Sequence, residues 1–366
     1  MLIVTELTVL KDISSIEHGG KLLMKATTVL NEVSSRKNNL QCKLLNKETR
    51  QDWSAVLDSG SKYLVQFDLV QLDYQSKYWN DDESVSFIVY VDSTPVAVMP
   101  LTLSKETDEY SISFYRMPLL PPVVSEGVTP KTLKKIYRTC LDAIREFQIE
   151  LEIPQVLFQN INTHQGLSLW FKCVASKSAR MEYREELFVD LSLPLAEIRQ
   201  FFRTRYKSLI SKGMRIWNVD IVDDDEIVFK EFKALHKSVS GRATRSEDTW
   251  WAQFSMLKSK DAFLVTLRDD DNQLVGGGLF SKNKAHAEYS VGVYDRSLFD
   301  TPLGHAVQFA AIEEMKRLGL KWYYLGPLCS EYDSYEYTDK ERSIAHFKEG
   351  FATHTFLNII LYASLT

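Results

Sequence analysis

The sequence predicts a mixed α/β fold arranged as two similar domains. Its 366 residues are enough for two domains of ordinary size. Both halves show one order of elements, in which two strands joined by a short turn and a third strand precede a loop and a helix. Strands that come in hairpins before each helix argue against a doubly wound nucleotide-binding fold. An internal repeat of this length indicates two related α/β units.

The first half carries three strand patterns and one helical pattern. β-Branched and aromatic residues fill 85–91, and after a short turn 95–101 returns as the second strand of a hairpin. Residues 110–115 alternate as a third strand. Residues 129–147 predict a helix, because Pro130 stands near its first turn and apolar side chains recur on one face.

The second half repeats this order. Residues 262–267 and 274–280 predict a hairpin around a charged turn, and residues 287–293 alternate strictly as the third strand. Residues 303–318 predict a helix with a continuous apolar side, and a further strand is predicted at 321–325.

Common catalytic signatures are absent from the sequence. It contains no G-x-G-x-x-G, G-x-x-x-x-G-K-[ST], G-x-S-x-G or H-E-x-x-H motif. This argues against a dinucleotide oxidoreductase, a P-loop kinase, a serine hydrolase and a zinc protease. The run Gly276-Gly277-Gly278 lies inside a strand pattern with no helix opening behind it. We interpret it as strand glycines that mark a bulge or a close backbone approach, rather than as a phosphate loop.

Composition narrows the class of protein further. Hydrophobic residues make up 45% and charged residues 25%, which is ordinary for a globular protein. The net charge of −5 argues against dedicated binding of duplex DNA. Neither a signal peptide nor an apolar run of the ~20 residues that a membrane span needs is visible. The 4 cysteines form no Cys-x-x-Cys pair, and none sits beside a histidine. We therefore expect a cytoplasmic protein with free thiols and no metal site.

A basic segment at 199–215 contains no acidic residue. Apolar residues at helical spacing give it an inner face, and Arg203, Arg205, Lys207 and Lys212 are among its cations. Arginine binds phosphate well because its planar fork donates two parallel hydrogen bonds. The segment therefore predicts an anion-binding helix, with a solvated helix face as the alternative.

A second basic stretch, 236–251, begins at His236 and reads as a loop rich in Gly, Ser and Thr. Ser246 with acidic residues behind it predicts a helix start. Arg242 and Arg245 predict a carboxylate- or phosphate-binding loop, and a plain surface loop is the alternative.

The segment 338–351 places Lys348 between Phe347 and Phe351. A lysine that aromatic neighbours partly desolvate can stabilise a developing negative charge. The alternative is a lysine whose stem packs on the rings while its ammonium group reaches water.

Taken in order, these segments resemble the FemABX-like branch of the GNAT acyltransferase superfamily. The resemblance lies in an R-x-x-Y-K-x-x-I-x-K-G helix, an H-x-x-x-x-G-R-x-x-R loop, the L-V-G-G-G-L-F and A-E-Y-S-V-G-V strands and an I-x-x-F-K-x-x-F tail. It covers roughly residues 60–355. It implies two tandem GNAT-like domains, a degenerate one at 1–185 and an acyltransferase domain at 186–366.

The resemblance also implies direct transfer of an acyl or aminoacyl group to an amine, with no covalent enzyme intermediate and no permanently bound cofactor. In GNAT enzymes two splayed strands hold the acyl donor, and the start of the following helix faces its phosphates. The loop before that helix holds Asp300 and no arginine, which departs from the usual coenzyme A loop. The resemblance leaves aminoacyl-tRNA and acyl-coenzyme A as the expected donors. Its expected contacts are Val291, Gly292, Val293, Leu303, Gly304 and His305.

By the same resemblance, Lys348 is the lysine that assists the transfer. Glu288 and His236 are the candidate bases that take the proton of the amine. The acceptor is expected to be a small molecule that carries phosphate, such as a nucleotide- or lipid-linked sugar. Its expected contacts are Arg203, Arg205, Lys207, Lys212, Arg242, Arg245, Tyr289 and Phe347.

Three functions stay open at the level of the sequence. The first is an acyl- or aminoacyltransferase of cell-envelope or surface-sugar biosynthesis. The second is a non-catalytic binding module that kept the fold, which the unusual loop at Asp300 favours. The third is an aminoacyl-tRNA–protein transferase that acts on peptide N-termini. In each case we expect a monomer or a homodimer.

Overall fold

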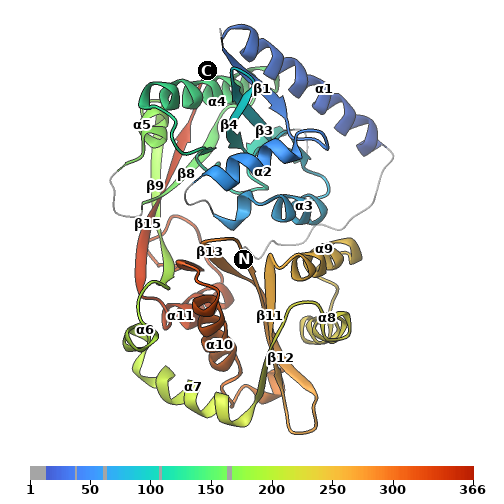
Figure 1. The fold of residues 1–366 in the computed structure, drawn as a ribbon, viewed down its shortest axis with the longest axis vertical. Helices are drawn as coiled ribbons and strands as arrows, with labels where there is room; N and C mark the ends of the chain where they lie inside the picture. Colours follow the sequence, from blue (N-terminus) through green and yellow to red (C-terminus); the bar gives the residue numbers. More distant parts are fainter. Residues whose placement is uncertain (1–13, 38, 61–63, 107–108, 163–166) are drawn as a thin grey trace. The chain divides into compact units, whose positions relative to one another are not determined.

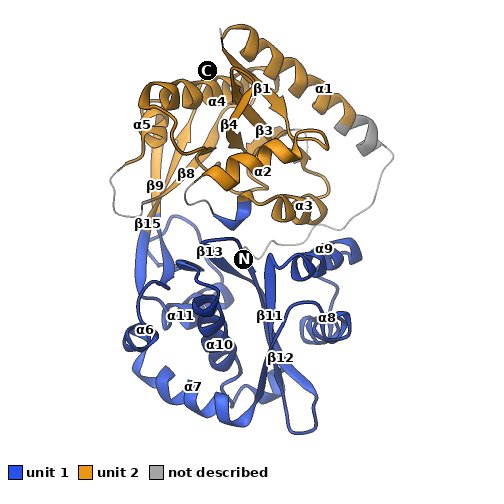
Figure 2. Cartoon of the chain, viewed as in Figure 1, with its two compact units in different colours: residues 1–3, 64–66, 184–356 blue, residues 4–63, 67–183, 357–366 orange. Residues whose placement is uncertain are grey.

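The computed structural model describes residues 14–37, 39–60, 64–106, 109–162 and 167–366. The chain forms two compact units (Figure 2). The N-terminal unit comprises the described residues of 4–63, 67–183 and 357–366, and the C-terminal unit comprises 64–66 and 184–356. Two strands, β9 (Ser178–Asp190) and β15 (His354–Ala363), run from one unit into the other (Figure 1).

Both units have the mixed α/β structure that the sequence predicts (Figure 1). In the N-terminal unit the predicted hairpin is confirmed, since β3 (Phe87–Val91) pairs antiparallel with β4 (Thr94–Met99). The predicted helix is α4 (Pro130–Glu150), and the side chain of Thr129 caps it. The other elements are α1 (Ser14–Ser35), β1 (Leu40–Leu44), α2 (Arg50–Ser59), α3 (Leu69–Tyr78), β2 (Glu83–Ser84), β5 (Thr102–Glu106), β6 (Glu109–Ser113), β7 (Val123–Val124), β8 (Val156–Asn162) and α5 (Leu169–Ala175).

The strands of the N-terminal unit form a four-stranded sheet of order β1-β3-β4-β7 and a three-stranded sheet of order β2-β5-β6. The second part of β15 pairs antiparallel with β8. Within the residues that the structure describes, no helix is long and apolar enough to span a membrane.

The C-terminal unit is built on strands that pair in the order β10-β11-β12-β13-β14-β9. Neighbours are antiparallel, except that β13 and β14 are parallel. Its elements are α6 (Leu195–Phe201), α7 (Thr204–Ile216), β10 (Asn218–Val222), α8 (Glu226–Ser240), α9 (Glu247–Lys258), β11 (Ala262–Arg268), β12 (Leu274–Lys282), β13 (His286–Tyr294), α10 (Leu303–Arg317), β14 (Trp322–Pro327) and α11 (Asp339–Glu349), with short 3-10 turns at Val65–Phe67 and Arg296–Leu298.

Two glycines of β12 let helices approach this sheet closely. A Cβ atom on Gly277 would lie 3.2 Å from the Phe232 ring of α8, and one on Gly278 would lie 2.9 Å from Val307 of α10. Successive residues of a strand point to opposite faces, so α8 and α10 cover opposite faces of the sheet. The interpretation of the glycine run as a close approach inside a strand is confirmed.

The basic segment predicted as one helix forms two helices, α6 and α7, separated at Phe202 and Arg203. Phe202 is extended (ψ 138°) and buried in the core of the unit. The Arg203 N–H donates a hydrogen bond of 2.9 Å to the Gly350 carbonyl. These distant contacts replace the helical hydrogen bonds, which is why the local pattern did not reveal the break.

His236 lies in a helix and not in a loop as predicted. The apolar spacing of Phe229 and Phe232 continues through His236 on the buried face of α8. The helix ends at Gly241, whose φ of 71° favours glycine. The predicted helix start at Ser246 is confirmed, since its side chain accepts a hydrogen bond from the Thr249 N–H at the start of α9.

Candidate active site

β13 and β14 diverge within the C-terminal unit. They pair in parallel only from His286↔Trp322 to Glu288↔Tyr324, although β13 continues to Tyr294 and β14 to Pro327. The ladder therefore ends at Glu288 and Tyr324. Beyond this pair the facing edges of the two strands no longer bond to each other.

Lys348 of α11 lies at this divergence. Its Nζ atom is 5.4 Å from the ring centroid of Tyr289 on β13 and 3.3 Å from the place that a Cβ on Gly326 of β14 would take. The residue is 6% exposed, which does not fit an ammonium group that reaches water. Burial lowers the pKa of Lys348 from 10.5 to about 8, and nearby acidic groups including Glu288 limit the fall. Lys348 is thus a desolvated cation at neutral pH.

Glu288 lies within electrostatic range of Lys348, at the last pair of the ladder. Its Oε2 atom accepts a hydrogen bond of 2.6 Å from Gln66 Nε2. Burial raises the pKa of Glu288 to about 7, and the positive charge of Lys348 opposes this rise. A carboxylate whose pKa lies near neutrality suits a general base.

A second carboxylate near Lys348, that of Glu186 on β9, was not found by sequence reasoning. It is fully buried. Its Oε2 accepts a hydrogen bond of 2.7 Å from the Tyr324 hydroxyl, and its Oε1 accepts one of 2.8 Å from Arg184 Nε. Burial and Glu186 raise the pKa of Tyr324 above its usual range. A glutamate in an alternating strand usually faces solvent, so the sequence carried no signal for this group.

The expected donor strand offers mainly its backbone. Val291 and Val293 are buried in the core, and the Tyr289 ring fills the space beside Gly292. The Tyr289 hydroxyl lies 2.9 Å from the Tyr294 hydroxyl. The side chains of Val291 and Val293 are therefore committed to packing and Gly292 has none, so only the main chain at 291–293 can contact a donor.

Gly292→Ala should destabilise the protein, because the new Cβ would lie 1.6 Å from the Tyr289 hydroxyl oxygen. We expect a loss of about 1–3 kcal/mol in the free energy of unfolding, typical of overpacking. Urea unfolding measures it. Gly20→Ala is the control, because nothing lies within 4 Å of a Cβ at this helical position. Equal stability of the Gly292→Ala protein and the wild type would contradict the packing described.

The first turn of α10 contains the expected phosphate contacts Leu303, Gly304 and His305. No side chain caps this helix, but the Leu303 N–H already donates to the Thr301 carbonyl at 3.0 Å, so the N–H groups of Gly304 and His305 are the ones that suit an anion. The His305 ring meets Tyr206 and Phe347 edge-on, with centroids 4.5 and 5.1 Å apart. His305 Nε2 is buried and bonds to no described residue. Burial, together with Arg205, lowers the pKa of His305 to about 4, so the ring is neutral at pH 7.

Arg203 connects α7 with α11. Its guanidinium lies 2.9 Å from a carboxylate oxygen of Glu349 and 2.9 Å from His346 Nε2. The guanidinium also lies over the aromatic ring of Tyr206. The Tyr206 hydroxyl donates a hydrogen bond of 3.2 Å to the Phe347 carbonyl. These contacts fix the helix that carries Lys348, so Arg203 has a structural role beside any contact with substrate.

The other predicted cations of α7 face outward. Arg205 and Lys212 are exposed, and Lys207 is half-buried. No acidic residue of the described chain forms an ion pair with any of these three. The positive charge of α7 is therefore available to an anion.

His236 contacts Trp250, with ring centroids 5.2 Å apart, and Arg245 stacks on the same indole at 5.2 Å. Burial and Arg245 lower the pKa of His236 to about 4. A group with so low a pKa binds a proton weakly at pH 7, so of the two candidate bases Glu288 has the pKa that better suits proton transfer near neutrality. Arg242 is exposed directly after Gly241.

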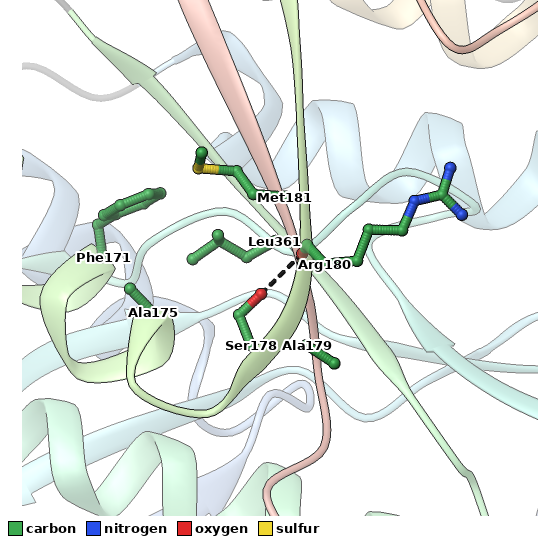
Figure 3. A pocket seen from close by; sticks show the side chains of 7 residues that line it. All are labelled: Phe171, Ala175, Ser178, Ala179, Arg180, Met181 and Leu361. Carbon is green, nitrogen blue, oxygen red and sulfur yellow. Dashed lines mark hydrogen bonds between the residues drawn. The ribbon is translucent and has the colours of Figure 1, made fainter.

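A surface pocket lies in the N-terminal unit, and none of the residues that line it is a predicted site residue (Figure 3). Its lining is mostly apolar, and the Ser178 hydroxyl donates to the Arg180 carbonyl at 2.7 Å. The lining residues are Phe171, Ala175, Ser178, Ala179, Arg180, Met181 and Leu361. Among the described residues there is also no group of three or more His, Cys, Asp or Glu side chains that could hold a metal ion.

Neither a family model nor a curated protein matches the sequence. Solved structures do match. FemX is 12% identical with a TM-score of 0.58 over 88% of this chain and 98% of that chain. The L-PGS structure from Bacillus licheniformis is 12% identical with a TM-score of 0.55 over 86% and 92%. A tandem GNAT protein from the clavulanic acid biosynthesis pathway is 12% identical with a TM-score of 0.50 over 88% and 98%. The chain therefore has the tandem GNAT-like fold of FemX, which confirms the predicted resemblance at the level of the fold.

Proposed function

We propose that this protein is a transferase that moves an acyl or aminoacyl group from an activated donor to an amine. The observation that carries the proposal is the desolvated Lys348 ammonium beside the Glu288 carboxylate, at the point where β13 and β14 diverge. A general base with a pKa near 7 and a buried cation can both assist acyl transfer to an amine, the first by taking the proton of the amine and the second by stabilising the developing oxyanion.

In the proposed reaction the amine nitrogen attacks the carbonyl carbon of the donor. Glu288 takes one proton from that nitrogen, and Lys348 stabilises the negative charge that develops on the carbonyl oxygen. The bond from the carbonyl carbon to the leaving oxygen or sulfur then breaks, and the leaving group takes up a proton. The product is an amide, and the enzyme ends without a covalent adduct.

We further propose aminoacyl-tRNA or acyl-coenzyme A as the donor, and an acceptor that carries phosphate. The outward cations Arg205, Lys207 and Lys212 support anionic substrates. The exposed Asp300 before α10 would repel a phosphate there, which favours aminoacyl-tRNA over coenzyme A. The resemblance implies a role in cell-envelope or surface-polysaccharide biosynthesis, and we propose that the protein acts in the cytoplasm. We assign the transfer chemistry to residues 186–366 and regard residues 1–185 as a degenerate domain.

A thermal-shift screen followed by a transfer assay tests this function. The panel is acetyl-coenzyme A, longer acyl-coenzyme A species, charged tRNA and several nucleotide sugars, because a ligand of the folded state raises the melting temperature. We expect a shift with charged tRNA or a nucleotide sugar, and amide formation when donor and acceptor are combined. A shift with coenzyme A species alone would reassign the donor. Absence of any shift or transfer would favour a binding module that kept the fold.

A further inference from the structure

Gln66 reaches the candidate site from a distant part of the sequence and belongs to the same compact unit as Glu288. It lies in the 3-10 turn Val65–Phe67, where both of its neighbours are buried. Its Nε2 donates the 2.6 Å hydrogen bond to Glu288 Oε2. An ionised carboxylate can only accept, so this bond fixes which end of the carboxamide faces Glu288.

The opposite end of the carboxamide lacks a partner. Gln66 Oε1 is buried and accepts no hydrogen bond from any described residue. Buried acceptors of this kind are uncommon in folded proteins, and each one calls for a reason. The carboxylate of Glu288 also keeps acceptor capacity, because Gln66 is its one hydrogen-bond donor in the described chain. Gln66 Oε1 and the Glu288 carboxylate can therefore both accept further hydrogen bonds from N–H donors.

We propose that Gln66 Oε1 and the Glu288 carboxylate form the subsite of the nucleophile and select a primary amine as the acceptor group. This inference rests on the proposed function and deepens it. A primary ammonium carries three donors and can bond both acceptors at once, whereas a hydroxyl group carries one. Gln66 is thus a positioning residue that holds the nitrogen toward the carbonyl carbon while Glu288 takes one ammonium proton, which passes to solvent. The neutral amine then attacks, and its second proton passes by way of Glu288 to the leaving group.

The charges around this pair suit such a ligand. Lys348 on α11 is a positive group near Glu288, and it faces the oxygen of the donor carbonyl in the proposed reaction. Tyr324 on β14 lies opposite Glu288 in the ladder, and its hydroxyl is already committed to Glu186. The ammonium of the acceptor therefore finds its acceptors in Gln66 and Glu288.

A binding experiment that needs no turnover tests the subsite. The full chain is labelled with glutamate carrying ¹³C in its side-chain carboxyl group, and the Glu288 signal is assigned by its loss in Glu288→Gln. At pH 8 we expect ethylammonium to shift this signal, and tetramethylammonium, which has no N–H, to leave it in place. Gln66→Met should weaken ethylammonium binding about tenfold or more, as the loss of a hydrogen bond to a charged group predicts. Gln253→Met is the matched control, because Gln253 is another buried glutamine whose Oε1 lacks a partner.

A second variant covers the case in which Gln66→Met does not fold. Gln66→Glu keeps the shape and adds a negative charge, so at pH 9 it should bind ethylammonium more tightly than the wild type. In the transfer assay, Gln66→Met should raise KM for the amine at least about tenfold while KM for the donor stays unchanged. Equal shifts with both cations, or unchanged ethylammonium affinity in both Gln66 variants, would overturn the subsite. If ethylammonium binds as expected but no donor supports transfer, the proposed function fails and the amine subsite stands.

Discussion

Lys348→Met should lower kcat/KM for acyl transfer by roughly 10²–10³-fold, the usual loss when one stabiliser of an oxyanion is removed. The same variant should be more stable than the wild type at pH 7. Burial depresses the pKa of Lys348 from 10.5 to about 8, so folding carries a cost on the order of a few kcal/mol wherever the unfolded lysine is charged. Methionine fills the same space without this cost.

The sign of the stability effect can be followed with pH. Below pH 8 Lys348 is protonated in both the folded and the unfolded protein, so the full free-energy cost of burying its charge applies. This cost decreases as the pH rises to 10.5. We therefore expect the melting temperature of Lys348→Met to exceed that of the wild type at pH 7 and to approach it near pH 10. Lys340→Met, an exposed lysine of the same helix, is the control for both measurements. A variant that loses activity and stability together would mean that Lys348 serves packing alone.

Glu288→Gln should lower kcat/KM by about 10²–10⁴-fold, the range for loss of a general base. The wild type should show a bell-shaped pH profile. Activity rises through pH 7 as Glu288 ionises and falls through pH 8 as Lys348 loses its proton. In Glu288→Gln the rise of activity through pH 7, the acid limb of the profile, should disappear. Its alkaline limb should move to lower pH, because Glu288 raises the pKa of Lys348.

Steady-state rates of the purified protein between pH 5 and 10 measure this profile. Glu83→Gln is a matched control, since burial raises the pKa of that carboxyl group too, and Glu83 lies on β2 of the N-terminal unit. An acid limb that persists in Glu288→Gln would assign the base to another residue. His236, with a pKa of about 4, would then place the limb far lower.

The strands and helices could be predicted wherever the pattern was local. The alternation of 287–293 and the helical spacing of 303–318 appear as β13 and α10. The break between α6 and α7 could not, because it depends on the bond from the Arg203 N–H to Gly350, far along the chain. The loop composition after His236 likewise hid a helix whose end depends on the left-handed Gly241.

Phe347 and Phe351, which flank Lys348 in sequence, predicted its contact with aromatic rings but left open whether its ammonium group reaches water. Glu186 near Lys348 and Gln66 beside Glu288 could not be predicted, since each comes from a segment of ordinary composition. Only the fold brings the buried carboxylate of Glu186 and the carboxamide of Gln66, whose oxygen accepts no hydrogen bond from the described residues, to the end of the β13–β14 ladder. Site residues that lie in a single segment can be predicted from the sequence, whereas a site assembled from several segments cannot.

The divergence of β13 from β14 has a consequence for mutational scanning. Past Glu288 and Tyr324 the two strands present main-chain N–H and C=O groups to whatever lies between them, and Val291 and Val293 point into the core. Alanine substitution leaves such groups intact, so a scan would register loss of packing there and overlook the backbone completely. Replacing single peptide bonds of β13 by ester bonds removes one N–H at a time. The loss of ligand affinity at each ester position would measure how much the corresponding N–H group of β13 contributes to binding.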